Sequence, residues 1–143
     1  MTTFVSFLCI MFGGALGAVC RYFTQELVIR WTKLPGWVSI FVVNIVGSFL
    51  IGLAAAILQQ EIKDLQHLGR LSLELHTRPL QEGLAILAVG FCGAYTTFSS
   101  FSLDNYFLIH GKYGQLAVNM LGSLVGAFLA VWAGWSLAQM VFA

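Results

Sequence analysis

A dense run of hydroxyl side chains lies within one of the most apolar parts of this sequence. Five of the seven residues at positions 96–102 carry a hydroxyl group: Thr96, Thr97, Ser99, Ser100 and Ser102. Polar side chains at hydrocarbon depth tend to face a bundle interior or a watery path, and irregular backbone is tolerated there only where protein or a cavity covers it. Because two glycines also precede the run, we expect a helix that is interrupted between Gly93 and Thr97 and lines a route for something polar.

Two aromatic rings stand inside the same run. Phe98 and Phe101 are three residues apart, so they share one face of a helix, while Ser99 and Ser100 occupy adjoining faces. The edge of an aromatic ring carries positive quadrupole. Ring edges and hydroxyl hydrogens can therefore meet an anion without a fixed charge that would trap it. The alternative is ordinary core packing, which the spacing of the two rings favours when it is taken alone.

The composition places these residues in a membrane. Of the 143 residues, 59% are hydrophobic and 9% are charged, and the mean hydropathy is +0.86, a balance outside the usual range of soluble domains. A membrane-crossing helix needs about 20 residues. The apolar runs therefore predict an all-α membrane protein with a single domain, residues 1–143, whose four transmembrane helices span about 4–23, 36–58, 81–110 and 114–142. Residues 59–80 are expected to form a surface loop or helix.

Charge and reactive groups argue against several classes of protein. A net charge of +1 without a basic cluster argues against a nucleic-acid partner. An enzyme is not expected, because Ser99 and Cys92 have no histidine or carboxylate base beside them in the membrane interior. The strongest alternative is a small multidrug-type, proton-coupled cation exporter, which requires a membrane-embedded carboxylate. Asp104, near the outer half of the third helix, is the one candidate for that role.

Two further polar residues have two interpretations each. Asn44 lies within the second predicted helix, where an amide serves either as an interhelical hydrogen-bonding group or as a pore-lining one. Arg21 is the one charge of the first predicted helix and lies near its end. It is either an interfacial anchor or a cation that draws anions into a vestibule.

The basic residues are balanced between the two sides of the membrane. One side is expected to carry Lys63, Arg70 and Arg78, and the other Arg30, Lys33 and Lys112, with Arg21 as a possible fourth. An excess of basic residues on one face normally fixes how a membrane protein inserts. Without that excess, we expect the chain to insert in both orientations and to pair antiparallel with itself across a two-fold axis.

The motifs together resemble the Fluc/CrcB family of fluoride channels along all four predicted helices. The similarity rests on Gly-Phe-Cys-Gly at 90–93 followed by Thr-Thr-Phe-Ser-Ser-Phe-Ser at 96–102, on the glycine-rich stretch 13–18 before Arg21, and on Asn44 with Gly47 and Ser48. The resemblance implies an antiparallel, dual-topology homodimer in the bacterial cytoplasmic (inner) membrane. Such a dimer has two pores and exports fluoride passively, which gives fluoride resistance.

The resemblance also implies roles for individual residues. Phe98 and Phe101 would be the rings that line the pore, Asn44 an amide near the ion path, and Arg21 a vestibule residue. The remaining polar positions along the path would be Ser99, Ser100, Asn119 and Ser123. A structural sodium ion on the dimer axis would be held by the backbone carbonyls of Gly93 and Thr96. This last role is chemically sensible, since an interrupted helix frees carbonyl oxygens and hard cations accept oxygen ligands.

Overall fold

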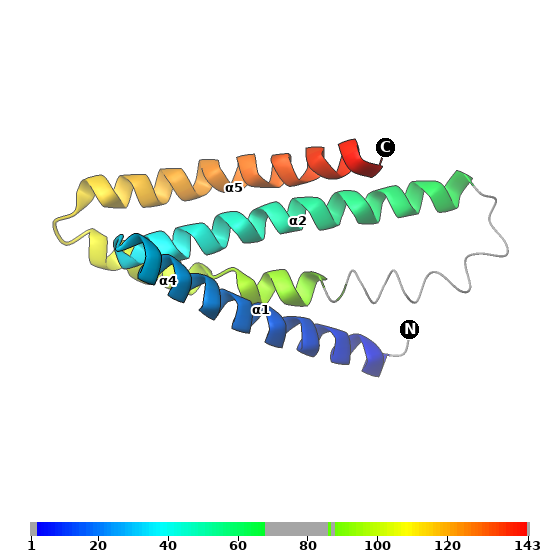
Figure 1. Ribbon diagram of the computed structural model, residues 1–143, viewed down its shortest axis with the longest axis horizontal. Coiled ribbons are helices and arrows are strands. Elements are labelled where there is room, and N and C mark those ends of the chain that lie inside the picture. Colours follow the sequence, from blue (N-terminus) through cyan, green and yellow to red (C-terminus); the bar gives the residue numbers. More distant parts are fainter. Residues whose placement is uncertain (1–2, 68–85, 87, 143) are drawn as a thin grey trace.

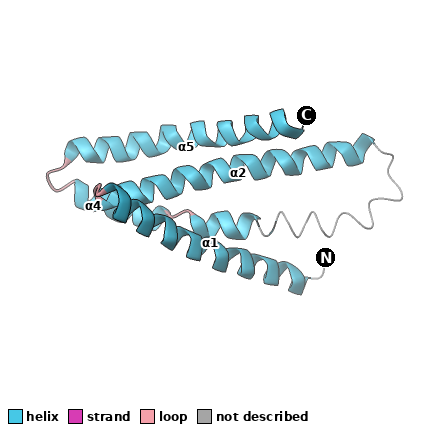
Figure 2. Cartoon of the chain, viewed as in Figure 1, coloured by secondary structure: helices cyan, strands magenta, loops and turns pink. Residues whose placement is uncertain are grey.

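The computed structural model describes residues 3–67, 86 and 88–142. Four long helices account for most of this part of the chain: α1 (Thr3–Thr32), α2 (Gly36–His67), α4 (Phe98–Leu108) and α5 (Tyr113–Phe142). Residues 88–95 are also helical. Within the described residues no β-strand is present (Figure 2), so the prediction of an all-helical fold is confirmed.

The helices alternate in direction along the chain (Figure 1). The segment of residues 88–108 runs in the same sense as α1, whereas α2 and α5 run back the other way, and both termini lie at the same end of the molecule. A short turn joins α4 to α5. In that turn Gly111 adopts a φ of +107°, a left-handed conformation that glycine adopts without steric cost.

Three of these helices are long and apolar enough to cross a membrane. The candidate spans among the described residues are Phe4–Thr32, Gly36–Gln60 and Tyr113–Val141. The remaining predicted crossing, at about 81–110, begins outside the described residues. Most of the predicted surface segment 59–80 also lies outside them. The four-crossing arrangement and its bounds therefore stay a prediction.

Two helices continue beyond the ends expected from hydropathy. The first crossing was expected to end near residue 23, but α1 is helical to Thr32. Residues 24–32 contain neither glycine nor proline, and the Glu26–Arg30 ion pair supports this last part of the helix at i,i+4 spacing. Pro35 follows, and a proline disfavours helical backbone in the residue before it. In the same way, α2 passes the expected end at residue 58 and reaches His67.

Glycines allow the helices to approach closely. On the contact between α2 and α5, a methyl group added to Gly52 would overlap the Val131 carbonyl, and one added to Gly134 would overlap the Phe49 carbonyl. This helix pair shares the most extensive contact in the described fold. A methyl on Gly17 of α1 would likewise overlap the Phe91 carbonyl. Small residues are expected at such crossings, because they let two backbones touch.

Candidate functional site around Thr97

The helical conformation is lost for two residues just before α4. Residues 88–95 are helical, Thr96 forms a bend, and Thr97 is extended with φ −150° and ψ 117°. The Thr96 N–H still donates to the Cys92 carbonyl at 3.0 Å, as in a helix. The regular backbone therefore stops at Thr96 and begins again with Phe98, the first residue of α4.

Asn44 on α2 binds the extended residue through both ends of its side-chain amide. The Thr97 N–H donates to Asn44 Oδ1 at 2.8 Å, and Asn44 Nδ2 donates to the Thr97 carbonyl at 3.1 Å. One turn further along α2, Gly47 lies so close that an added methyl would overlap the Thr96 side chain. A paired amide contact of this kind replaces hydrogen bonds that a continuous helix would supply, since buried backbone groups need partners.

The Thr97 hydroxyl caps α4 and joins two serines. It accepts a hydrogen bond from the Ser100 N–H at 3.2 Å, which is the standard contact of a helix N-cap residue. It also donates to Ser100 Oγ at 3.1 Å and lies 3.2 Å from Ser99 Oγ. Three hydroxyl groups therefore form one cluster at the start of α4.

The two phenylalanines lie together at this end of α4. The centroids of the Phe98 and Phe101 rings are 5.9 Å apart and the ring planes are tilted by 39°. Phe98 is 79% exposed in the isolated chain, whereas Phe101 is partly buried. Ser99 and Ser102 are exposed as well. The start of α4 therefore presents a ring and hydroxyl groups on the outside of the single chain.

Arg21 reaches the same place from α1. Its Nη1 donates to the Thr96 carbonyl at 3.4 Å. One turn later on α1, the hydroxyl oxygen of Thr24 lies 3.1 Å from that of Tyr95. The Tyr95 residue is only 4% exposed. The arginine is thus within α1 and beside the interruption, where the sequence alone had placed it near a helix end.

Asn119 and Ser123 on α5 form a second polar group, which faces Asn105 near the end of α4. Asn119 is 1% exposed, and its Nδ2 donates to Asn105 Oδ1 at 2.9 Å. Ser123 Oγ donates to Asn119 Oδ1 at 3.4 Å. These bonds join α5 to α4. The predicted site residues therefore divide into a group around Thr97 and this separate pair on α5.

Two contributors were not singled out from the sequence. Thr97 was recognised only as one of several hydroxyl residues, and Asn105 was not named at all. Asn105 lies four residues after Phe101, so both project from neighbouring turns of one helix face. An amide at that spacing within an apolar stretch is the signal that would have identified it.

Asp104, the candidate carboxylate of the exporter alternative, is partly buried in α4. Its Oδ2 atom is buried and has no hydrogen-bond partner within the described part of the chain.

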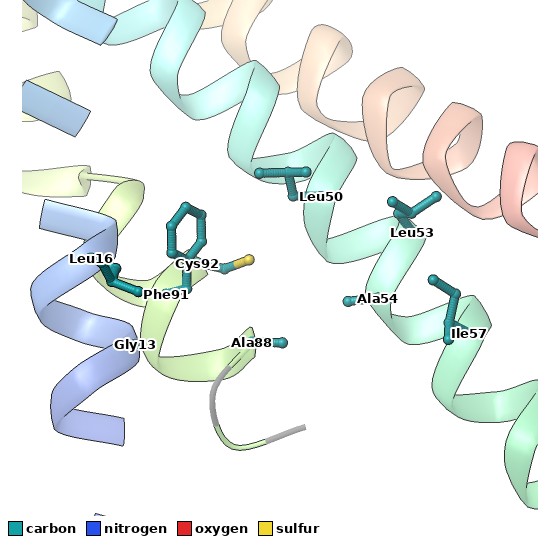
Figure 3. A pocket seen from close by; sticks show the side chains of 9 residues that line it. All are labelled: Gly13, Leu16, Leu50, Leu53, Ala54, Ile57, Ala88, Phe91 and Cys92. Carbon is teal, nitrogen blue, oxygen red and sulfur yellow. The ribbon is translucent and has the colours of Figure 1, made fainter. Parts of the chain in front are cut away.

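A separate cavity of about 440 Å³ lies between α1, α2 and residues 88–92 (Figure 3). Its walls are apolar, and they are formed by Gly13, Leu16, Leu50, Leu53, Ala54, Ile57, Ala88, Phe91 and Cys92. The cavity therefore offers an anion no hydroxyl or amide donor from a side chain.

Comparison with known proteins identifies the family. The family described as "CrcB-like protein, Camphor Resistance (CrcB)" matches residues 8–135, which is most of the chain. The chain belongs to the CrcB-like family. The resemblance seen in its motifs is thereby confirmed.

Several curated proteins are similar to this chain over nearly their whole length, and each is named "Fluoride-specific ion channel FluC". The one from Phenylobacterium zucineum is 39% identical over 133 residues, covering 92% of this chain and 93% of the relative. The one from Nitrobacter winogradskyi is 37% identical over 137 residues, covering 94% and 95%. The one from Vibrio parahaemolyticus is 34% identical over 129 residues, covering 90% of each.

These bacterial relatives and the three apolar helices show that the chain is a multi-pass protein of the cytoplasmic membrane. These relatives are by name ion channels and not enzymes. The comparisons give the multidrug-exporter alternative no support.

Proposed function

We propose that this protein is a fluoride-selective channel that exports fluoride passively across the cytoplasmic membrane and so gives fluoride resistance. The observation that carries the proposal is the outward-facing start of α4, where Phe98 and two hydroxyl residues are exposed in a chain that spans a membrane. Lipid does not satisfy hydroxyl groups. Exposed hydroxyl groups at this position should therefore either line an ion path or be covered by a protein partner. We propose that both apply here.

The chemistry of this surface suits a small anion that must pass and not stay. Ring edges of Phe98 and Phe101 offer weak positive potential, and Ser99 and Ser100 offer hydroxyl hydrogens. Asn119 and Ser123 would continue the polar path along α5. Conduction requires sites that are favourable enough to enter and weak enough to leave. Arg21 adds a cation at the Thr96 end, where it would attract anions towards the entrance.

The channel is proposed to be an antiparallel homodimer with dual topology. Residues 88–95 and α4 would be two halves of one membrane crossing, and the exposed face of α4 would meet a second copy. Gly93 supports this proposal, because it is exposed and a methyl added to it meets no atom of its own chain within 4 Å. The balance of basic residues across the membrane is the reason to expect the antiparallel arrangement.

A sodium ion on the dimer axis fits the donors available at the interruption. The Gly93 and Thr96 carbonyls are hard oxygen donors, and two such pairs in a dimer would supply four ligands. The described residues contain no cluster of three or more His, Cys, Asp or Glu side chains that could hold a metal, so backbone oxygens are the donors to consider. A bound sodium ion would supply positive charge between the pores and link the two copies.

Fluoride efflux from liposomes tests the proposed function. Purified protein is reconstituted into vesicles loaded with potassium fluoride, and release is followed with a fluoride electrode after valinomycin is added. We expect rapid release of fluoride and, in parallel vesicles loaded with chloride, release no faster than in vesicles without protein. Fluoride release equal to that of protein-free vesicles would contradict the proposal, and equal release of both anions would contradict its selectivity.

A further inference from the structure

The interruption before α4 has a specific hydrogen-bonding cause. In a continuous α-helix each carbonyl accepts from the N–H four residues later. The helical donor to the Gly93 carbonyl would be the Thr97 N–H, but that group donates to Asn44 Oδ1 at 2.8 Å. The helical donor to the Thr96 carbonyl would be the Ser100 N–H, but that group donates to Thr97 Oγ1 at 3.2 Å. The side chains of Asn44 and Thr97 therefore accept the two N–H groups that would otherwise donate to the Gly93 and Thr96 carbonyls.

We propose that Asn44 and Thr97 are positioning residues for a monovalent cation site, and that they act by keeping the Gly93 and Thr96 carbonyls open. Asn44 would then serve the cation site. This inference rests on the proposed dimeric channel, because one chain supplies only two of the oxygens that a sodium ion requires. It gives Asn44 a role beyond the ion-path role that the family resemblance implies.

The geometry of Asn44 supports this assignment. Its Oδ1 accepts from the Thr97 N–H and its Nδ2 donates to the Thr97 carbonyl, so both ends of the amide hold the backbone of one residue. Thr97 is 8% exposed, and its polar backbone groups therefore need a protein partner. If Asn44 is removed, the replacement acceptor for the Thr97 N–H is the Gly93 carbonyl, as in an uninterrupted helix. That change would close the site.

The surroundings of the two carbonyls differ. Gly93 is exposed, and no atom of its own chain lies within 4 Å of an added methyl group, so space remains beside it. The Thr96 carbonyl accepts a long hydrogen bond of 3.4 Å from Arg21, which a cation ligand can share because a carbonyl oxygen has two lone pairs. The cation site would therefore depend most on Gly93, and hence on Asn44.

The dependence of thermal stability on sodium tests this inference. A ligand at free concentration c that binds only the folded state stabilises it by RT ln(1 + c/Kd), so the unfolding midpoint rises with the ligand concentration once that concentration exceeds Kd. The full-length protein in detergent is unfolded in increasing NaCl, with N-methyl-D-glucamine chloride keeping the ionic strength constant. The variants are Asn44→Ala and Ser48→Ala, the second being a matched control one turn along α2. We expect sodium to stabilise the wild type and Ser48→Ala alike, and Asn44→Ala to need at least tenfold more sodium for the same rise in the unfolding midpoint.

Each other outcome has a defined meaning. If Asn44→Ala forms a dimer that responds to sodium as the wild type does, the inference is wrong. If that dimer also loses fluoride efflux, the result would indicate that Asn44 acts on the ion path. A wild-type protein without a sodium response would overturn it too, while wild-type fluoride efflux in liposomes would leave the proposed channel function standing.

If Asn44→Ala does not assemble, Thr97→Val decides. This variant keeps the N–H that Asn44 binds and removes only the hydroxyl that takes the Ser100 donor. We expect a weakened sodium response, and an unchanged one would contradict the inference.

Discussion

The α2–α5 pair and the interrupted part of the segment of residues 88–108 are held in place in different ways. Along α2 and α5 the helices touch backbone to backbone, with Gly52 and Gly134 at the closest points, and both helices are continuous over 30 residues or more. The segment 88–108 is interrupted at Thr96 and Thr97. Its first half packs on α1 through Gly17, which lies against the Phe91 carbonyl. At the interruption and along α4, the side chains of Asn44 and Asn119 hold it to its neighbours.

This difference suggests that α2 and α5 form the scaffold, whereas the region around Thr97 carries the function. Close packing through glycine has no polar group to offer and is sensitive to any added volume. Polar side chains that bind backbone groups hold an irregular segment in place and leave other polar groups directed outwards. Substitutions in the first region should therefore change folding, whereas substitutions around Thr97 should change function at a smaller cost in stability.

The largest loss of stability is expected from Gly134→Val. The added side chain overlaps the Phe49 carbonyl, so α2 and α5 must separate, and we expect a loss of at least about 3 kcal/mol, the upper end of the usual cost of overpacking. The measurement is the unfolding free energy of purified protein in detergent. Gly114→Val on the same helix is the control, because no atom lies within 4 Å of a methyl added there. Equal losses in the two variants would show that the close approach is not what matters.

An intermediate loss is expected from Asn119→Leu. The change leaves Asn105 Oδ1 without its donor at a buried contact, and an unsatisfied buried acceptor costs about 2 kcal/mol. The measurement is a double-mutant cycle with Asn105→Leu. We expect the double variant to lose less stability than the sum of the two single variants. Strict additivity would mean that the two amides do not stabilise each other.

The smallest loss is expected from Ser100→Ala. Its backbone N–H still donates to Thr97, and the Thr97 hydroxyl can turn its hydrogen to Ser99 Oγ, 3.2 Å away. We expect a cost of about 0.5–1 kcal/mol, that of one hydrogen bond, with Ser102→Ala on the exposed side of α4 as the reference. A loss as large as that of Asn119→Leu would show that the hydroxyl cluster, and not the backbone cap, fixes the start of α4.

Much of the fold was visible in the sequence, because apolar length and composition alone require membrane helices. The helix ends were not. Hydropathy reports where a helix leaves the hydrocarbon, whereas the backbone of α1 stays helical to Thr32. Lys33 then has a positive φ of 51°, and Pro35 disfavours helical backbone at Leu34. The position of the irregular stretch was signalled by glycines and hydroxyl residues between Gly93 and Ser102.

The partners of the site residues were not predictable from spacing. Asn44 could be recognised as a polar group that needs a partner, but nothing in the sequence says that this partner is the backbone of Thr97. Asn105 escaped notice because its role depends on Asn119, fourteen residues away on another helix. Exposure was equally hidden, since Phe98 and Phe101 have the same residue type and differ only in how the fold covers them.

The most direct test of the central claim compares two exposed phenylalanines in the liposome efflux assay. Phe98 is 79% exposed beside the hydroxyl cluster, and Phe128 on α5 is 72% exposed among apolar neighbours. We expect Phe98→Ile to abolish fluoride efflux while the dimer still forms, and Phe128→Ile to conduct as the wild type does. Wild-type efflux through assembled Phe98→Ile would contradict the claim that this end of α4 conducts the anion.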